Sequence, residues 1–165
     1  MTIYFWIILA VCVLDQLTKV WAMDLIAAAN SMSVEQVAEG NTLPIFENIL
    51  HFTYLENSGM SFGLLADHRW VFMLLSAVGI VALFVYLVSL RGNGKLICTS
   101  LSLVIGGGIG NMFDRVSLGY VVDFIDVRCI PGWKWIFNLA DSAVCVGAAL
   151  LILGILLEYK KEKVK

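Results

Sequence analysis

Long apolar segments alternate with polar ones along this chain of 165 residues. A helix needs about 20 residues to cross the hydrocarbon core of a bilayer. Four apolar stretches are about that long, and they cover residues 3–25, 70–90, 96–113 and 137–157. The first lacks a basic n-region and a small-residue cleavage site, so we expect it to remain as a membrane helix. We therefore expect one membrane-embedded, α-helical polytopic domain over residues 1–165.

Two polar segments separate these stretches, and they cover residues 26–69 and 114–136. The run from Ala27 to Glu39 predicts a short helix that ends at Gly40. Residues 49–55 and 120–127 are rich in β-branched and aromatic side chains, which predicts strands. The expected fold is four transmembrane helices with a small extracytoplasmic β-sheet and a short helix.

The distribution of charge predicts how the helices are oriented. Four spans place both termini on one side, together with the loop Arg91–Lys95. That side holds six of the eleven Lys and Arg residues and two of the thirteen acidic residues. Because Lys and Arg concentrate on the cytoplasmic side of membrane proteins, we expect cytoplasmic termini.

Composition excludes several classes of function. Hydrophobic residues make up 60% of the chain and charged residues 15%, which is too apolar for an ordinary soluble domain. A net charge of −2 gives no electrostatic basis for binding nucleic acid. The four cysteines and two histidines form no CxxC motif or Cys–His cluster, so we expect neither a metal site nor a cofactor.

Two aspartates are candidates for catalysis. Asp123 lies in a predicted strand, and Asp141 lies about one turn into the last apolar stretch, where an unpartnered carboxylate costs several kcal/mol. Two carboxylates held close together share a proton. The ionised one can then deprotonate a water while the protonated one polarises a peptide carbonyl. The competing interpretation is structural, with Asn138 or Asp141 capping the last helix.

Polar side chains also gather at the end of the third apolar stretch. The glycines within residues 106–110 favour close contact between helices. They do not explain Asn111, Asp114 and Arg115, which occupy neighbouring helix positions at the outward end. A solvated ion pair at the interface is the alternative interpretation for Asp114 and Arg115.

Asp15 and Lys19 are four residues apart on the first apolar stretch, where they can neutralise one another. Structural bracing is the favoured role for this pair. A relay through Asp15, Asp123 and Asp141 would instead indicate a small proton-coupled transporter. Transporters place such acids at the midplane between related repeats, whereas the halves of this chain show no similarity. A purely structural four-helix scaffold would leave the polar clusters unexplained.

Five motifs of this chain resemble, in the same order, those of the lipoprotein signal peptidases, also called signal peptidase II. They are Asp15–Lys19, Asn57–Phe62, Gly107–Arg115, Val121–Ile125 and Phe137–Asp141. Any one of them is weak evidence, but five in order are highly specific. Met60 and Ser61 stand where the family usually has alanines.

The resemblance implies an aspartyl endopeptidase of the bacterial cytoplasmic membrane, with its active site at the extracytoplasmic face. Such an enzyme removes the signal peptide from diacylglyceryl-modified prolipoproteins, just before the lipidated cysteine. Its partners are these substrates and membrane lipids. By position, Asp123 and Asp141 are implied to be catalytic. Residues implied to orient them or hold the substrate are Asn57, Asn111, Arg115 and Asn138. Supporting roles are expected for Asp15, Lys19, Gly59, Gly107 and Asp114.

Overall fold

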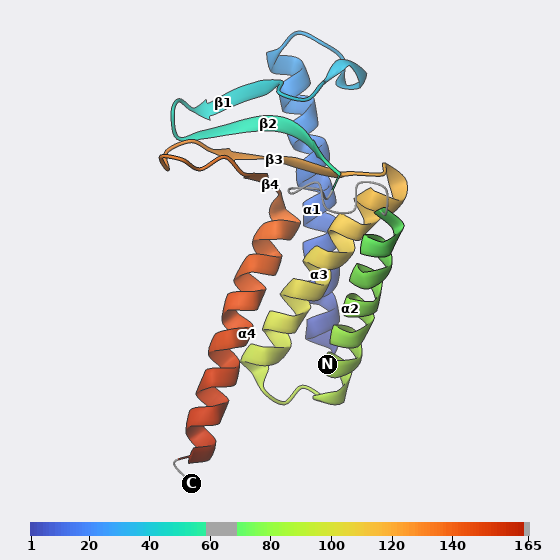
Figure 1. Ribbon diagram of the computed structural model, residues 1–165, viewed down its shortest axis with the longest axis vertical. Helices are drawn as coiled ribbons and strands as arrows, with labels where there is room; N and C mark the ends of the chain where they lie inside the picture. The colour runs from blue at the N-terminus through green and yellow to red at the C-terminus, as the bar shows by residue number, and fades with distance from the viewer. Residues whose placement is uncertain (59–68, 164–165) are drawn as a thin grey trace.

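The computed structural model describes residues 1–58 and 69–163. Its helices form a bundle of α1 (Thr2–Ala29), α2 (Arg69–Ser89), α3 (Lys95–Ser117) and α4 (Leu139–Lys163). Figure 1 shows α3 between α2 and α4, and α3 contacts each of the other helices. Both chain ends and the α2–α3 loop lie at the end of the bundle that is remote from the strands (Figure 1).

Three of the described helices have the length and apolar composition of membrane spans. α1, α3 and α4 are long and apolar enough to cross a bilayer, and α2 contributes the shorter apolar stretch Met73–Ser89. Large apolar side chains are exposed along the bundle, among them Leu75 on α2 and Ile152 on α4. Lipid tails are as apolar as these side chains and can cover them. The predicted fold class, a helical membrane protein with a small sheet, is confirmed.

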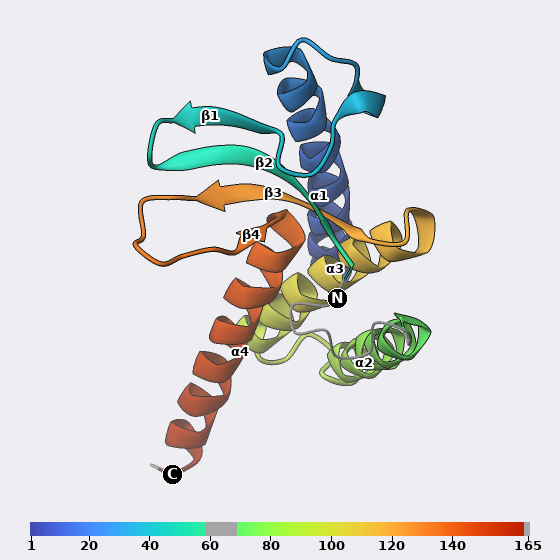
Figure 2. The same cartoon turned by 45° about the horizontal axis from the view of Figure 1, so that its top comes forward.

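The sheet is antiparallel throughout, and its strands are ordered as in the sequence. They are β1 (Thr42–Phe46), β2 (Leu50–Asn57), β3 (Val121–Val127) and β4 (Ile136–Phe137). The strands run from α1 to one side of the bundle, which is clearest in Figure 2. The sequence predicted the ends of β2 and β3 to within two residues, but it did not predict β1 or β4. β1 contains Pro44 and β4 has only two residues, so neither carries the alternating pattern of a strand.

The polar segment after the first helix differs from the prediction. α1 continues through Ala27–Ala29, because alanine has the highest helix propensity of all residues. The separate helix predicted from Ala27 to Glu39 is therefore wrong. This segment holds instead one 3₁₀ turn, η1 (Val34–Gln36), at whose start the Ser33 N–H donates to the Gln36 side chain at 2.9 Å.

The start of the last helix differs as well. Ile136 and Phe137 pair with Asp126 and Ile125 of β3, so they belong to the sheet. α4 therefore begins at Leu139 rather than at residue 137. This shift places Asp141 in the first turn of the helix.

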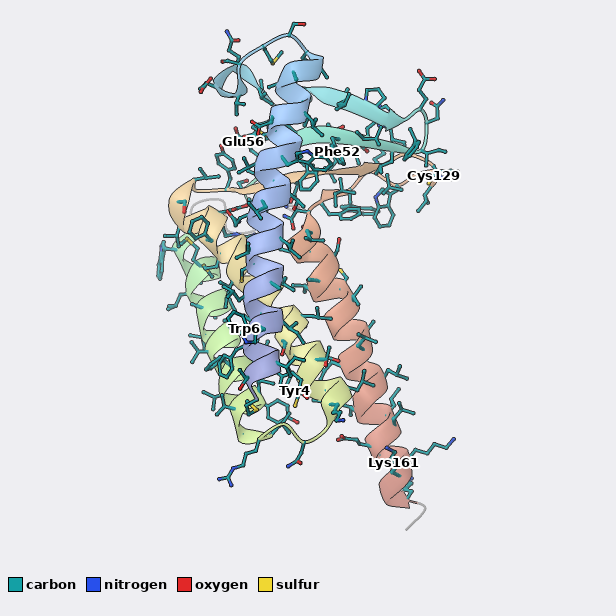
Figure 3. All side chains as sticks on the ribbon, turned by 180° about the vertical axis from the view of Figure 1, so that it is seen from behind. Tyr4, Trp6, Phe52, Glu56, Cys129 and Lys161 are labelled. Carbon is teal, nitrogen blue, oxygen red and sulfur yellow. The ribbon has the colours of Figure 1, made fainter. Side chains whose placement is uncertain are left out.

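Two apolar clusters lie on either side of a polar layer. The first joins α1, α2 and α3, and its buried members are Tyr4, Ile8, Leu87, Ile97, Cys98, Leu101 and Ile105. The second joins α1 to the sheet through Ile26, Tyr54 and Val122, with Phe52 packed against it. Figure 3 shows Tyr4 and Phe52 well apart along α1. Between the two clusters, α1 carries the buried residues Asp15 and Lys19.

Candidate active site at the junction of sheet and helices

Asp123 lies on β3, where the sheet meets the bundle, and its side chain is fully buried. Both of its carboxylate oxygens accept hydrogen bonds from amide side chains. Asn57 Nδ2, at the end of β2, donates to Asp123 Oδ2 at 2.7 Å. Asn138 Nδ2, just before α4, donates to Asp123 Oδ1 at 2.7 Å. The carboxylate is therefore held between two elements that are far apart in the sequence.

Asp141 is half-buried in the first turn of α4. Its backbone N–H donates to Asn138 Oδ1 at 2.8 Å, and the Asn138 N–H approaches Asp141 Oδ2 at 3.4 Å. Asn138 thus caps the helix, as the structural interpretation predicted. The other oxygen, Asp141 Oδ1, accepts a hydrogen bond from Asn111 Nδ2 at 2.7 Å. Capping and participation in the site are therefore compatible.

Two amides connect the two carboxylates. Asn138 Nδ2, which contacts Asp123, also lies 3.1 Å from Asn111 Oδ1. Asn111 in turn donates to Asp141. The hydrogen bonds that link Asp123, Asn138, Asn111 and Asp141 place both acids in one network, at the end of the helix bundle next to the sheet.

Burial raises the pKa of Asp123 to about 7. The hydrogen bonds from Asn57 and Asn138 oppose this rise because they stabilise the ionised form, whereas the negative charge of Asp141 adds to it. This carboxyl group therefore retains its proton to a higher pH than an ordinary aspartate does. One protonated and one ionised acid is the arrangement from which the sequence predicted acid–base chemistry.

A buried ion cluster lies beneath the two acids. Lys19 Nζ contacts Asp15 Oδ2 at 2.7 Å and Asp114 Oδ2 at 2.6 Å, and all three side chains are at most 5% exposed. The predicted pairing of Asp15 with Lys19 is confirmed. The alternative of a solvated Asp114–Arg115 pair is wrong, since Asp114 is buried and bonded to Lys19.

The carboxylates of the ion cluster also accept hydrogen bonds from backbone N–H groups next to Asp123 and Asp141. Asp15 Oδ1 accepts a hydrogen bond from the Ala140 N–H at 2.9 Å. Asp114 Oδ2 accepts one from the Val122 N–H at 3.1 Å. Gln16, for which the sequence indicated no role, donates to Asp114 Oδ1 at 2.7 Å. Its position beside Asp15 in the first motif was the available signal.

The remaining predicted residues fall into three groups. Arg115 donates to the Asn111 carbonyl at 3.2 Å and lies within electrostatic reach of both acids. A Cβ at Gly107 would overlap the Ala140 carbonyl oxygen, so this glycine allows α4 to approach α3 closely, as predicted for the glycine run. Gly59, Met60 and Ser61 lie outside the described residues.

Comparisons with known proteins show which family the chain resembles. The sequence model of the family described as "Signal peptidase (SPase) II" matches residues 7–157. The lipoprotein signal peptidase of Halothermothrix orenii is 39% identical over 158 residues, covering 96% of both chains. That of Clostridioides difficile is 35% identical over 163 residues, covering 98% of this chain and 99% of the relative.

Solved structures show the same fold. One, described as a bacterial membrane enzyme determined by the in meso method at 1.9 Å, matches with a TM-score of 0.78. It is 28% identical and covers 94% of each chain. A second such structure, at 2.3 Å, matches with a TM-score of 0.73 and 27% identity, and covers all of this chain and 94% of the other.

Proposed function

Since the chain belongs to the signal peptidase II family, a family of lipoprotein signal peptidases, we propose that Asp123 and Asp141 cleave prolipoproteins as an aspartyl pair. The observation that carries this proposal is the amide network that joins the carboxylates of Asp123 and Asp141. Family membership also favours the peptidase over the transporter that the sequence left open. Asp15, which a proton relay would need, is instead engaged by Lys19 and the Ala140 N–H.

In the proposed mechanism Asp141 is the base and Asp123 the acid. The fully buried Asp123 retains a proton more readily, because its pKa is raised to about 7. Asp141 takes a proton from a water, whose oxygen bonds to the carbonyl carbon of the scissile peptide. Asp123 gives its proton to the carbonyl oxygen, which yields a tetrahedral diol. Asp141 then gives its proton to the peptide nitrogen, and the C–N bond breaks while Asp123 takes a proton back from one hydroxyl of the diol. The acyl product leaves as a carboxylic acid, the other product leaves as an amine, and the pair again holds one proton.

The asparagine side chains hold the two carboxylates in fixed orientations. Asn57 and Asn138 hold Asp123, and Asn111 holds Asp141, so each carboxylate retains its orientation as protons move. Positioning of this kind lowers the activation barrier for peptide hydrolysis, because the reacting groups are already oriented before the reaction begins. The positive charge of Arg115 offsets the negative charge shared by the pair.

The proposed substrate is a prolipoprotein whose cysteine already carries diacylglycerol, with cleavage just before that cysteine. Acyl chains gain about 0.8 kcal/mol per buried methylene when they stay in the bilayer. They therefore fix the scissile bond at the depth of the interface. Asp123 is on β3 and Asp141 is in the first turn of α4. These two elements lie at the same end of the apolar bundle (Figure 1), which is where such a bond would be presented.

The proposed location is the bacterial cytoplasmic membrane, with the termini in the cytoplasm and the site at the outer face. The end of the bundle that holds the termini also holds the α2–α3 loop (Figure 1). The basic residues concentrate at that end, as the positive-inside rule requires of a cytoplasmic side.

The experiment that tests this function is incubation of the purified protein with a lipidated prolipoprotein and its unlipidated precursor. Release of the signal peptide from the lipidated form only is the expected result. Equal cleavage of both forms would contradict the proposed recognition of the lipid, and cleavage of neither would contradict the activity itself.

A further inference from the structure

Grooves in the helix layer and in the sheet layer differ in chemistry. A groove of about 360 Å³ between α2 and α3 is lined by apolar side chains, including Ile80, Ile109 and Phe113. A groove of about 260 Å³ in the sheet layer, which we name the sheet groove, combines Leu55 and Trp135 with Asn57, Ser58 and Lys134. The first suits acyl chains or an apolar helix, whereas the second suits a peptide with polar groups.

The sheet groove adjoins the proposed catalytic pair. Asn57 lines the groove and donates to Asp123 Oδ2 at 2.7 Å. Leu55, which also lines it, is the register partner of Asp123 between β2 and β3. Directly opposed residues on neighbouring antiparallel strands project to the same face of the sheet. The groove and the Asp123 carboxylate therefore share one face.

The two products of cleavage must leave the aspartates in different directions. A signal peptide is apolar and matches the apolar groove between α2 and α3. The mature lipoprotein is water-soluble beyond its lipid anchor, so its chain must leave on the side of the sheet. We infer that the sheet groove binds the first residues of the mature chain after the lipidated cysteine, and that Lys134 selects for their charge. This inference rests on the proposed function.

Two charged side chains, those of Lys134 and Glu56, line the sheet groove. Within residues 1–58 and 69–163, no acidic side chain forms an ion pair with Lys134. Glu56, which also borders the groove, accepts a hydrogen bond from the Tyr54 hydroxyl at 3.0 Å, which draws its carboxylate toward the side where Tyr54 packs on α1. Lys134 can therefore pair with an acidic substrate side chain and repel a basic one.

The test uses three lipidated precursors that differ only in the residue after the cysteine, which is Asp, Asn or Lys. We expect the wild-type protein to cleave them in the order Asp, Asn, Lys, with steps of about threefold in kcat/KM that arise in KM. This is the scale of an exposed charge pair, and it should shrink as salt is added. Lys134→Glu should reverse the order, and Lys134→Gln should abolish it.

Lys161→Glu is the matched control, because it makes the same change of charge at the far end of α4 (Figure 3). It should retain the order of the wild-type protein. An unchanged order in Lys134→Glu, or equal rates for the three precursors with the wild-type protein, would overturn the inference. The Lys134→Gln variant keeps the test valid if charge reversal disturbs folding. Failure of the wild-type protein to cleave any lipidated precursor would count against the proposed function instead.

Discussion

The Asp15 carboxylate accepts a hydrogen bond from the backbone N–H of Ala140 at 2.9 Å. This bond ties the middle of α1 to the first turn of α4, one residue before Asp141. The other oxygen of Asp15 contacts Lys19 Nζ at 2.7 Å. The position of one proposed catalytic acid thus depends on a buried charge that lies 126 residues earlier in the chain.

Asp114 has the corresponding role for the other acid. It accepts a hydrogen bond from the Val122 N–H, one residue before Asp123, and it contacts the same Lys19 Nζ. One lysine therefore connects the two carboxylates that hold the strand and the helix of the proposed pair. This arrangement is a physical basis for a supporting role of the ion cluster.

We expect Asp15→Ala to lower stability rather than to act on the chemistry alone. The substitution leaves the Ala140 N–H without its acceptor and removes one of the anions around Lys19. Breaking a buried ion pair by removing one partner costs about 3–5 kcal/mol. The measurement is the melting temperature in detergent, together with the amount of protein that accumulates. Asp15→Asn, which keeps an oxygen acceptor, should be affected less. A fully stable but wholly inactive Asp15→Ala protein would place Asp15 in the chemistry.

Gly107→Ala should destabilise the protein by about 1–3 kcal/mol, the usual cost of overpacking. Its Cβ would overlap the Ala140 carbonyl and lie 2.8 Å from Val144 Cγ2, so α3 and α4 would have to separate. Gly79→Ala on α2 is the control, because among residues 1–58 and 69–163 no neighbouring element comes within 4 Å of a Cβ added there. That change should be neutral or stabilising, since alanine favours a helix. Equal melting temperatures for the two variants would contradict the close-contact role of Gly107.

The sequence predicted the elements that carry the proposed site, because their signals are local. Long apolar runs indicate the helices, and Asp123 and Asp141 are conspicuous among apolar neighbours. The pairing of Asp15 with Lys19 follows from helical spacing. These features need no knowledge of what packs against them.

The features that prediction missed depend on tertiary contacts. Nothing in the sequence around Asp114 indicates that its partner is Lys19, 95 residues earlier, so a surface pair with Arg115 was an equal alternative. β4 exists because two residues pair with β3, and this pairing moves the start of α4 to Leu139. Gln16 acquires a partner only once α1 packs against α3.

We expect Asn57→Ala to move the pH dependence of cleavage. The hydrogen bond from Asn57 lowers the pKa of Asp123, so its loss should raise that pKa further. In the proposed mechanism activity falls at high pH as the pair loses its shared proton. The alkaline limb of the pH–rate profile should therefore move to higher pH, with a lower maximal rate because Asp123 is less well oriented. An alkaline limb that stays in place or moves to lower pH would contradict this assignment.

Thermal stability should report the raised pKa of Asp123 independently of activity. From about pH 4 to 7, the unfolded chain has released a proton that the folded protein retains at Asp123. Stability therefore falls as pH rises through this window, by at most about 4 kcal/mol, and the penalty is complete above about pH 7. Asp123→Asn removes the penalty. The melting temperature of Asp123→Asn minus that of the wild-type protein should therefore increase from pH 5 to pH 8. A difference that stays constant over this range would contradict the raised pKa of Asp123.

The proposed aspartyl pair is tested most directly by cleavage of a lipidated prolipoprotein with Asp123→Asn, Asp141→Asn and the double variant, at matched amounts of folded protein. Asparagine has nearly the same shape but can neither take a proton from water nor share one with its partner. Asp126→Asn, on the same strand but paired with Arg128, is the control and should turn over like the wild-type protein. We predict that each single variant releases no signal peptide and that the double variant is hardly worse, because the two acids act as a unit. Turnover like that of the wild-type protein in either single variant would remove that residue from catalysis and leave the mechanism without a pair.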